Sequence, residues 1–79
     1  DQEPIQLSYK EFELLKVFME HPGEVFTRQW LYERIWNGTY SEKNRTVDIH
    51  VQTLRKKLGT CGSLIESVKY IGYRMKKVP

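Results

Sequence analysis

The sequence predicts an α+β domain in which three helices precede a C-terminal β-hairpin. Two observations carry this prediction. Three separate segments before residue 59 repeat apolar residues at helical spacing, and two short runs of strand-forming residues follow residue 63. A chain of 79 residues has room for one domain and not two. We therefore expect residues 1–79 to form a single domain.

The first helix is expected at residues 9–20. Ser8 and Glu11 form the S-x-x-E capping box that starts many helices, and Leu7 precedes it as a hydrophobic staple for Phe12. Apolar side chains then recur at helical spacing and predict the inward face: Phe12, Leu14, Leu15, Phe18 and Met19.

Two short strands are expected to flank this helix. Ile5-Gln6-Leu7 alternates apolar and polar residues, which favours a strand whose partner must come from elsewhere in the chain. His21-Pro22-Gly23 ends the helix, because proline has no N–H to donate and glycine tolerates a positive φ. Val25-Phe26 is an apolar pair that we expect to make one strand pairing.

The second helix is expected at residues 28–36, with Thr27 as its N-cap. Its apolar and aromatic residues lie four apart in two pairs: Leu31 with Ile35, and Tyr32 with Trp36. Asn37-Gly38 ends the helix, and residues 37–44 form a polar loop without apolar periodicity.

The third helix is expected from Arg45 or Thr46 to Leu58, with Gly59 at its C-terminal cap. Four apolar residues fall within about 60° of one another around this helix and predict a core-facing stripe: Val47, Val51, Leu54 and Leu58. The opposite arc carries Arg45, Thr46, Ile49, Gln52, Thr53 and Lys56. Ile49 stands out because an apolar side chain on that arc has no core to fill.

The hairpin follows the helices. A turn is expected at Thr60-Cys61-Gly62-Ser63. A strand is expected at residues 64–68 and its return strand at residues 73–76. Residues 69–72 connect the strands, with Gly72 available for a positive φ. Three helices followed by a hairpin is the order of a winged helix-turn-helix, and we expect that fold with the hairpin as its wing.

The charge is divided unevenly along the chain. Residues 1–36 carry a net charge of −3 and residues 37–79 one of +6, within a total of +3. A basic C-terminal half favours a polyanionic partner on that side. A solvated basic face would give the same count, so charge alone leaves both interpretations open.

Composition also narrows the class of protein. No apolar run approaches the roughly 20 residues that span a bilayer, and the acidic, polar start shows no signal peptide. Cys61 is the single cysteine, so we expect neither a disulfide framework nor a cysteine-based metal site. A reducing, cytoplasmic location fits this count, and we expect no metal, cofactor or membrane contact.

The outward face of the third helix has the chemistry to read DNA in the major groove. Ile49 can touch a thymine methyl group, while Thr46 and Thr53 can bond base edges or phosphates. Three consecutive cations lie near the helix end, where cations also complement the helix dipole: Arg55, Lys56 and Lys57.

Three further residues keep two interpretations each. Lys69, at the hairpin tip, suits a minor groove or is a solvated turn lysine. Trp36 fills the core, or donates its indole N–H to a phosphate while its ring packs inward. His50, at the flank of the outward face, is a phosphate donor or a surface histidine.

Taken together, the chain resembles the effector domain of OmpR/PhoB-type response regulators, the output half of bacterial two-component systems. The motifs that carry the resemblance span nearly the whole chain in the right order. They are residues Leu7–Leu15, His21–Arg28, Leu31–Trp36, Arg45–Val51, Leu54–Leu58, Ile65–Lys69 and Gly72–Arg74.

The resemblance implies a sequence-specific transcription regulator that binds tandem half-sites as a dimer, with the third helix in the major groove and the wing in the minor groove. It implies phosphate contacts for Arg28, Trp36, Arg45, His50, Gln52 and Arg55. It implies base reading by Thr46, Ile49 and Thr53, and makes Lys69 the wing cation. It also implies that loop 37–44 contacts RNA polymerase, through Thr39, Tyr40, Glu42 and Lys43.

Some positions depart from the family. Gln52 and Thr53 stand where arginine is frequent, which should weaken binding and change the sequence that is read. Lys69 replaces a frequent arginine and offers a point charge instead of a planar fork. Tyr70 stands where glycine is common and should make the wing tip bulkier.

Family members also carry a four-stranded N-terminal sheet and, before it, a phosphoacceptor receiver domain. We expect the receiver and most of that sheet to lie outside this chain, together with any control by phosphorylation. A sheet edge left open in this way is available to pair with another copy.

Other classes of function fit the residues less well. A winged helix used only for protein contact needs apolar residues across the outward face of the third helix, where only Ile49 is apolar. RNA binding would need aromatic stacking residues there. We expect no enzyme: Asp48 and His50 point about 200° apart on the helix, and no glycine-rich phosphate loop is present.

Overall fold

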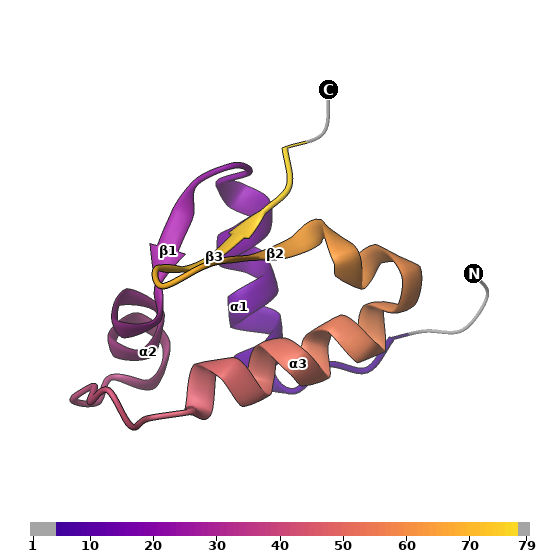
Figure 1. Cartoon of the computed structure of the whole chain (residues 1–79). Helices are drawn as coiled ribbons and strands as arrows, with labels where there is room; N and C mark the ends of the chain where they lie inside the picture. The colour runs from indigo at the N-terminus through magenta and orange to yellow at the C-terminus, as the bar shows by residue number, and fades with distance from the viewer. Residues whose placement is uncertain (1–4, 78–79) are drawn as a thin grey trace.

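Three helices and a three-stranded antiparallel sheet make up residues 5–77, the part of the chain that the computed structural model describes (Figure 1). The elements are α1 (Tyr9–Glu20), β1 (Val25–Thr27), α2 (Arg28–Trp36), α3 (Thr46–Leu58), the 3-10 helix η1 (Gly59–Leu64), β2 (Ile65–Val68) and β3 (Gly72–Met75). The acidic start at residues 1–4, which entered the signal-peptide argument, lies outside the described residues. None of the described helices is long and apolar enough to cross a membrane.

Helix α1 begins with the predicted capping box. The Glu11 backbone N–H donates to Ser8 Oγ at 3.2 Å, and the Ser8 backbone N–H donates to Glu11 Oε1 at 2.9 Å. Two backbone donors that a helix start leaves free are thereby satisfied. The same carboxylate accepts a 2.7 Å bond from Lys57 Nζ and so ties α1 to the end of α3. This bond is the main reason why the pKa of Glu11 is lowered.

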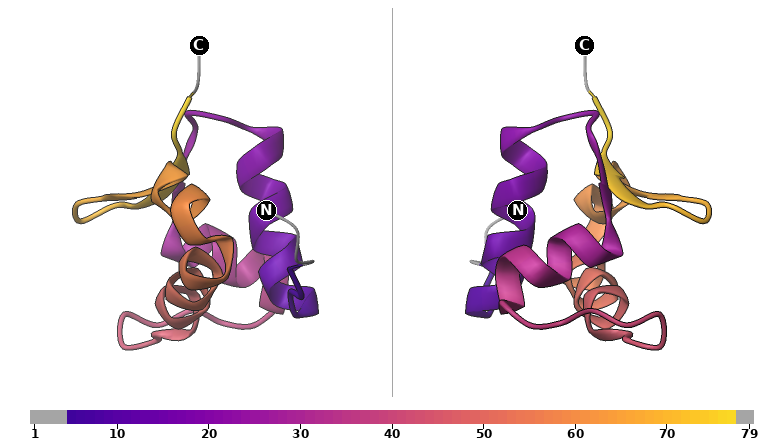
Figure 2. Two further views of the ribbon diagram at one scale, coloured as in Figure 1. Left: turned by 90° about the vertical axis from the view of Figure 1, so that its right-hand side faces the viewer. Right: turned by 90° about the vertical axis from the view of Figure 1, so that its left-hand side faces the viewer.

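The sheet has the order β1-β3-β2, so the return strand of the hairpin is its central strand. Phe26 of β1 and Ser67 of β2 both lie opposite Tyr73 of β3. The single strand pairing expected for Val25-Phe26 is therefore confirmed, and its partner is the wing. Both views of Figure 2 show the β2–β3 hairpin projecting from the helical body.

The prediction for the hairpin connection is wrong in one respect. The positive φ falls on Tyr70, at 67°, and not on Gly72. Gly72 is required for a different reason: a Cβ there would overlap the Phe26 carbonyl oxygen of the neighbouring strand. Glycine at this position lets β1 approach β3 closely.

The core lies between the three helices and the sheet. It contains the α3 stripe almost as predicted, with Val47, Val51 and Leu54 buried and Leu58 partly buried against them. The other members come from α1, α2 and the three strands: Leu14, Phe18, Phe26, Leu31, Ile35, Ile65, Tyr73 and Met75. This packing holds α3 in place and leaves its opposite face outward.

Four local predictions need correction. Ile5-Gln6-Leu7 belongs to no strand in the structure. The apolar face of α1 was drawn too wide, because Phe12 is 52% and Met19 62% exposed. The turn at residues 60–63 is part of η1, which includes Leu64 and delays β2 to Ile65. Lys76 lies beyond β3, although its N–H still donates to Leu64 O at 2.7 Å.

Candidate nucleic-acid interface

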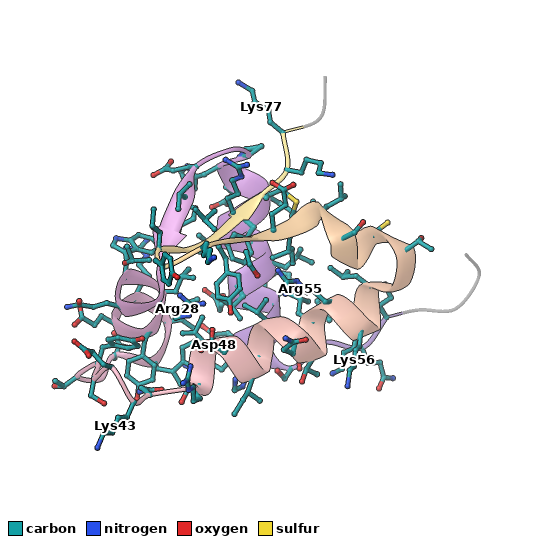
Figure 3. The ribbon with its side chains drawn as sticks, in the orientation of Figure 1. Arg28, Lys43, Asp48, Arg55, Lys56 and Lys77 are labelled. Atoms are coloured by element: carbon teal, nitrogen blue, oxygen red, sulfur yellow. The ribbon has the colours of Figure 1, made fainter. Side chains whose placement is uncertain are left out.

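The outward face of α3 is exposed along the helix, as predicted. Ile49 is 60% exposed although it is apolar. Arg45, Gln52 and Lys56 are exposed, while Thr46 and Thr53 are half-buried. In Figure 3, Lys56 points away from the body, as does Lys43 in the preceding loop.

The start of α3 is capped by a residue that the sequence reasoning passed over. Arg45 stands at the N-cap position, but its side chain makes no cap hydrogen bond. Instead, Asn44 Oδ1 accepts from the Thr46 backbone N–H at 2.9 Å. This arrangement fixes the first turn of α3 and leaves the Arg45 side chain in solvent.

Arg28 is oriented inward, toward α3. Its Nε–H donates to Asp48 Oδ1 at 2.6 Å, and its guanidinium lies 4.9 Å from the centre of the Tyr73 ring. The hydrogen bond to Asp48 is the largest cause of the raised pKa of Arg28. Burial acts to raise the pKa of Asp48, but hydrogen bonds from Tyr73 and Arg28 outweigh it and lower that pKa. Both groups are therefore charged at neutral pH.

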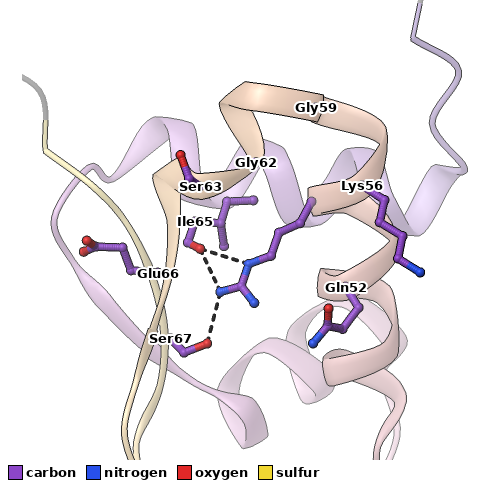
Figure 4. Close-up of a pocket in the computed structure, with 9 residues that line it drawn as sticks. Gln52, Lys56, Gly59, Gly62, Ser63, Ile65, Glu66 and Ser67 are labelled. Carbon is purple, nitrogen blue, oxygen red and sulfur yellow. Dashed lines mark hydrogen bonds between the residues drawn. The ribbon is translucent and has the colours of Figure 1, made fainter.

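Arg55 joins α3 to the wing. Its Nε and Nη2 groups donate to Ile65 O at 3.0 and 2.7 Å, and Nη2 also donates to Ser67 Oγ at 3.0 Å (dashed lines in Figure 4). Its guanidinium lies 5.5 Å from the centre of the Tyr73 ring. Between α3 and β2 runs a cleft whose lining includes Gln52, Lys56 and Ser67. Arg55 thus sets the position of the wing beside the outward face of α3.

Trp36 takes part in an aromatic cluster and is half-buried, which fits the interpretation that its ring packs inward. The ring stacks on Tyr32 with centres 5.7 Å apart and meets His50 edge to face at 4.9 Å. His50 Nδ1 lies 2.8 Å from Thr46 O. Because a carbonyl oxygen only accepts, Nδ1 carries the proton in this bond. His50 can then donate through Nε2 only in its doubly protonated form.

Loop 37–44 is anchored at one residue. Asn37 closes α2 in the left-handed conformation, at φ 57°. The Tyr40 ring packs against Tyr32 with centres 6.1 Å apart and is half-buried. Thr39, Glu42 and Lys43 are exposed. Of the four residues predicted to contact polymerase, Tyr40 therefore holds the loop against Tyr32, and the side chains of the other three are exposed.

The wing tip carries two exposed side chains. Lys69 is exposed, with its Nζ 5.2 Å from the centre of the Tyr70 ring. Tyr70 is 91% exposed. The tip of the hairpin therefore carries an exposed aromatic ring next to Lys69.

The sequence reasoning missed two residues at the centre of this region, Tyr73 and Asp48. The Tyr73 hydroxyl donates to Asp48 Oδ1, which joins β3 to the first turn of α3. No spacing signal could have revealed a contact between residues 25 positions apart.

Among residues 5–77, no group of three or more His, Cys, Asp or Glu side chains is arranged to hold a metal ion.

Comparison with known proteins identifies the family. The sequence model described as "Transcriptional regulatory protein, C terminal" matches residues 2–75. The chain belongs to this family. Among curated relatives, the phosphate regulon transcriptional regulatory protein PhoB of Escherichia coli is 37% identical over 75 residues, which cover 92% of this chain and 33% of that protein. TcrA of Mycobacterium tuberculosis is also 37% identical, over 92% of this chain and 30% of that protein.

Solved structures of this family share the fold. The RstA DNA-binding domain of Klebsiella pneumoniae, solved in complex with RstA box, has a TM-score of 0.83 at 29% identity and covers 95% of this chain and 77% of its own. The CpxR DNA-binding domain of E. coli has a TM-score of 0.85 at 26% identity, over 95% of this chain and 76% of its own. The predicted winged-helix fold and the OmpR/PhoB-type resemblance are confirmed. The chain spans about a third of the length of the curated relatives it matches.

Proposed function

We propose that this family member binds double-stranded DNA in a sequence-specific way, as the output domain of a response regulator. In this proposal α3 enters the major groove and the wing around Lys69 enters the neighbouring minor groove. The observation that carries it is the outward face of α3: cationic and hydroxyl side chains around an exposed Ile49, held outward by a buried stripe. Two relatives of the same fold were solved with DNA, RstA with RstA box and AdeR with an intercistronic region.

The individual contacts follow from the position of each side chain. On α3 the proposed base-reading residues are Thr46, Ile49 and Thr53. Arg45, Gln52, His50 and Trp36 are proposed to contact phosphates around them. Arg45 stands at the start of α3, Gln52 on its outward arc and His50 at the flank of that arc, where Trp36 of α2 contacts the His50 ring edge to face.

Arg28 and Arg55 are also proposed to contact phosphates, but with only some of their N–H groups. A guanidinium has five N–H groups. Arg28 uses Nε on Asp48, and Arg55 uses Nε and Nη2 on the wing. The remaining groups, both Nη atoms of Arg28 and Nη1 of Arg55, are the ones proposed to bond phosphate oxygens.

Further partners belong to the same proposal. Two copies are expected to associate on tandem half-sites, and the exposed residues of loop 37–44 to meet RNA polymerase. Residues 1–79 would act as one effector domain in the cytoplasm, and as a binding domain instead of an enzyme. A protein-contact role without DNA is less favoured, because Ile49 is the one apolar residue on the outward arc of α3.

Selection from a random DNA pool tests this function. We expect one motif to be enriched as a direct repeat, and affinity for it to fall linearly in log–log form with salt. Enrichment of no motif, with binding that disappears as salt rises, would contradict sequence-specific recognition by this chain.

A further inference from the structure

Asp48 is an acidic side chain next to a surface proposed to bind a polyanion. It lies in the first turn of α3, between the base-reading positions Thr46 and Ile49. A carboxylate here repels phosphates and lowers the affinity for all DNA. Its part in the proposed interface must therefore come from what it does to neighbouring groups.

One oxygen of this carboxylate gathers donors from two other elements. Asp48 Oδ1 accepts from Arg28 Nε of α2 at 2.6 Å and from the Tyr73 hydroxyl of β3. Figure 3 shows Arg28 and Asp48 on the side of α3 that faces the sheet. A single side chain thus joins the first turn of α3 to α2 and to the central strand of the sheet.

The second oxygen is left short of a partner. Asp48 Oδ2 is buried and has no hydrogen bond to any described residue. Arg45 Nη1 approaches it to 3.7 Å from an otherwise exposed side chain. Asp48 therefore also attracts the Arg45 guanidinium, at a distance longer than that of a hydrogen bond.

The contacts continue from Tyr73 into the wing. The guanidinium of Arg28 lies 4.9 Å and that of Arg55 5.5 Å from the centre of its ring. Arg55 in turn holds Ile65 O and Ser67 Oγ of β2. Asp48, Arg28, Tyr73 and Arg55, which we call the Asp48 cluster, link α2, α3 and both wing strands.

We propose that Asp48 is a positioning residue that sets sequence selectivity without touching DNA: through the Asp48 cluster it fixes α3 relative to the wing and holds Arg28 ready beside α3. The inference rests on the proposed function. A cognate site rewards simultaneous engagement of α3 and the wing, and pre-ordered donors lose less entropy on binding. Non-specific binding depends mainly on net charge and needs no such geometry.

The test compares two substitutions that remove the same charge. Asp48→Asn keeps the shape of the side chain. Glu66→Gln is the matched control, because its ion-pair partners are Arg74 at 2.9 Å and Lys76 at 3.8 Å, outside the Asp48 cluster. For each protein the Kd is measured on the enriched duplex and on a scrambled duplex at one salt concentration. Thermal unfolding reports whether each variant is folded.

Asp48→Asn is expected to lower the ratio of specific to non-specific affinity about ten-fold, through weaker binding of the enriched duplex. Glu66→Gln should tighten binding to both duplexes and leave the ratio unchanged. A purely structural role of Asp48 would reduce the folded fraction, which affects both duplexes equally and does not move the ratio.

A second variant keeps the inference testable if Asp48→Asn does not fold. Tyr73→Phe removes only the hydroxyl donor and retains the buried ring, and it should also lower the ratio. Wild-type selectivity in the folded variants, or a shift matching that of Glu66→Gln, would overturn the positioning role of Asp48. The proposed function would not be affected by that result. A wild-type chain without selectivity would overturn the proposed function and this inference with it.

Discussion

The Arg55 side chain of α3 makes its hydrogen bonds to the wing. Its two bonds to Ile65 O and its bond to Ser67 Oγ use the planar fork of the guanidinium. A lysine has a compact ammonium that cannot reproduce this geometry. The neighbouring Lys56 is exposed and points away from the body. Of these two adjacent cations, Arg55 therefore binds the wing, whereas Lys56 extends into solvent.

Arg55→Lys is expected to lower the free energy of unfolding by about 1–2 kcal/mol, because two hydrogen-bonded acceptors on β2 lose their donor. Urea unfolding measures the change. Lys56→Met is the control and should stay within about 0.5 kcal/mol of the wild type. An Arg55→Lys protein as stable as the wild type would show that Arg55 does not anchor the wing.

The side-chain partners of the candidate site were beyond the reach of sequence patterns. Arg28 and Arg55 were assigned to phosphates, yet each bonds a residue 10 or more positions away. Helical periodicity indicates which way a side chain leaves its own helix, but not what another element brings to it. The exposed Ile49 could be predicted, because its outward direction follows from its own helix alone.

The three helices could be predicted with accurate bounds because their end signals are local. The Thr27 hydroxyl accepts from the Trp30 backbone N–H at 3.0 Å, as an N-cap three residues away should. The pairing of β1 with β3 could not be located, because its partners are distant in sequence. The burial of Glu11 could not be predicted for the same reason, because its partner Lys57 lies 46 positions away in the sequence.

The Glu11–Lys57 contact between α1 and α3 makes stability depend on pH. The pKa of Glu11 is lower in the folded chain, so between the folded and unfolded values the unfolded chain binds more protons. The stabilisation is present above the unfolded pKa, at about pH 4, and is lost as pH falls through the folded pKa. Asp48, whose pKa is also lowered, acts in the same direction.

Glu11→Gln should therefore be less stable than the wild type at pH 7 and lose less stability on acidification to pH 3. Urea unfolding of both proteins at the two pH values measures this. Parallel losses in the two proteins would show that the ion pair is not the source of the pH dependence.

The positive charge of the whole molecule is concentrated in one part of the sequence. The net positive half of the sequence, residues 37–79, contains α3 and the wing. The net negative half, residues 1–36, contains α1, β1 and α2, so the excess of positive charge that attracts DNA belongs to the part of the chain that forms α3 and the wing. This asymmetry could be predicted from composition, whereas the direction of each cation needed the fold.

Arg45→Ala should weaken binding to every DNA sequence and reduce the slope of log affinity against log salt by about one unit. Lys16→Ala removes the same charge from the exposed surface of α1 and serves as the control, with an unchanged slope expected. The slope is measured by titrating salt against DNA affinity for both variants. An unchanged slope for Arg45→Ala would remove Arg45 from the phosphate contacts.

The central claim, that the outward face of α3 lies in the major groove, is tested most directly by replacing each thymine of the enriched duplex with deoxyuridine. This change removes only a methyl group from the major groove. We expect one replacement in each half-site to weaken wild-type binding by about 1 kcal/mol, roughly five-fold in Kd, and to have no effect on Ile49→Ala. Equal effects on both proteins, or none on either at any thymine, would contradict this placement of α3.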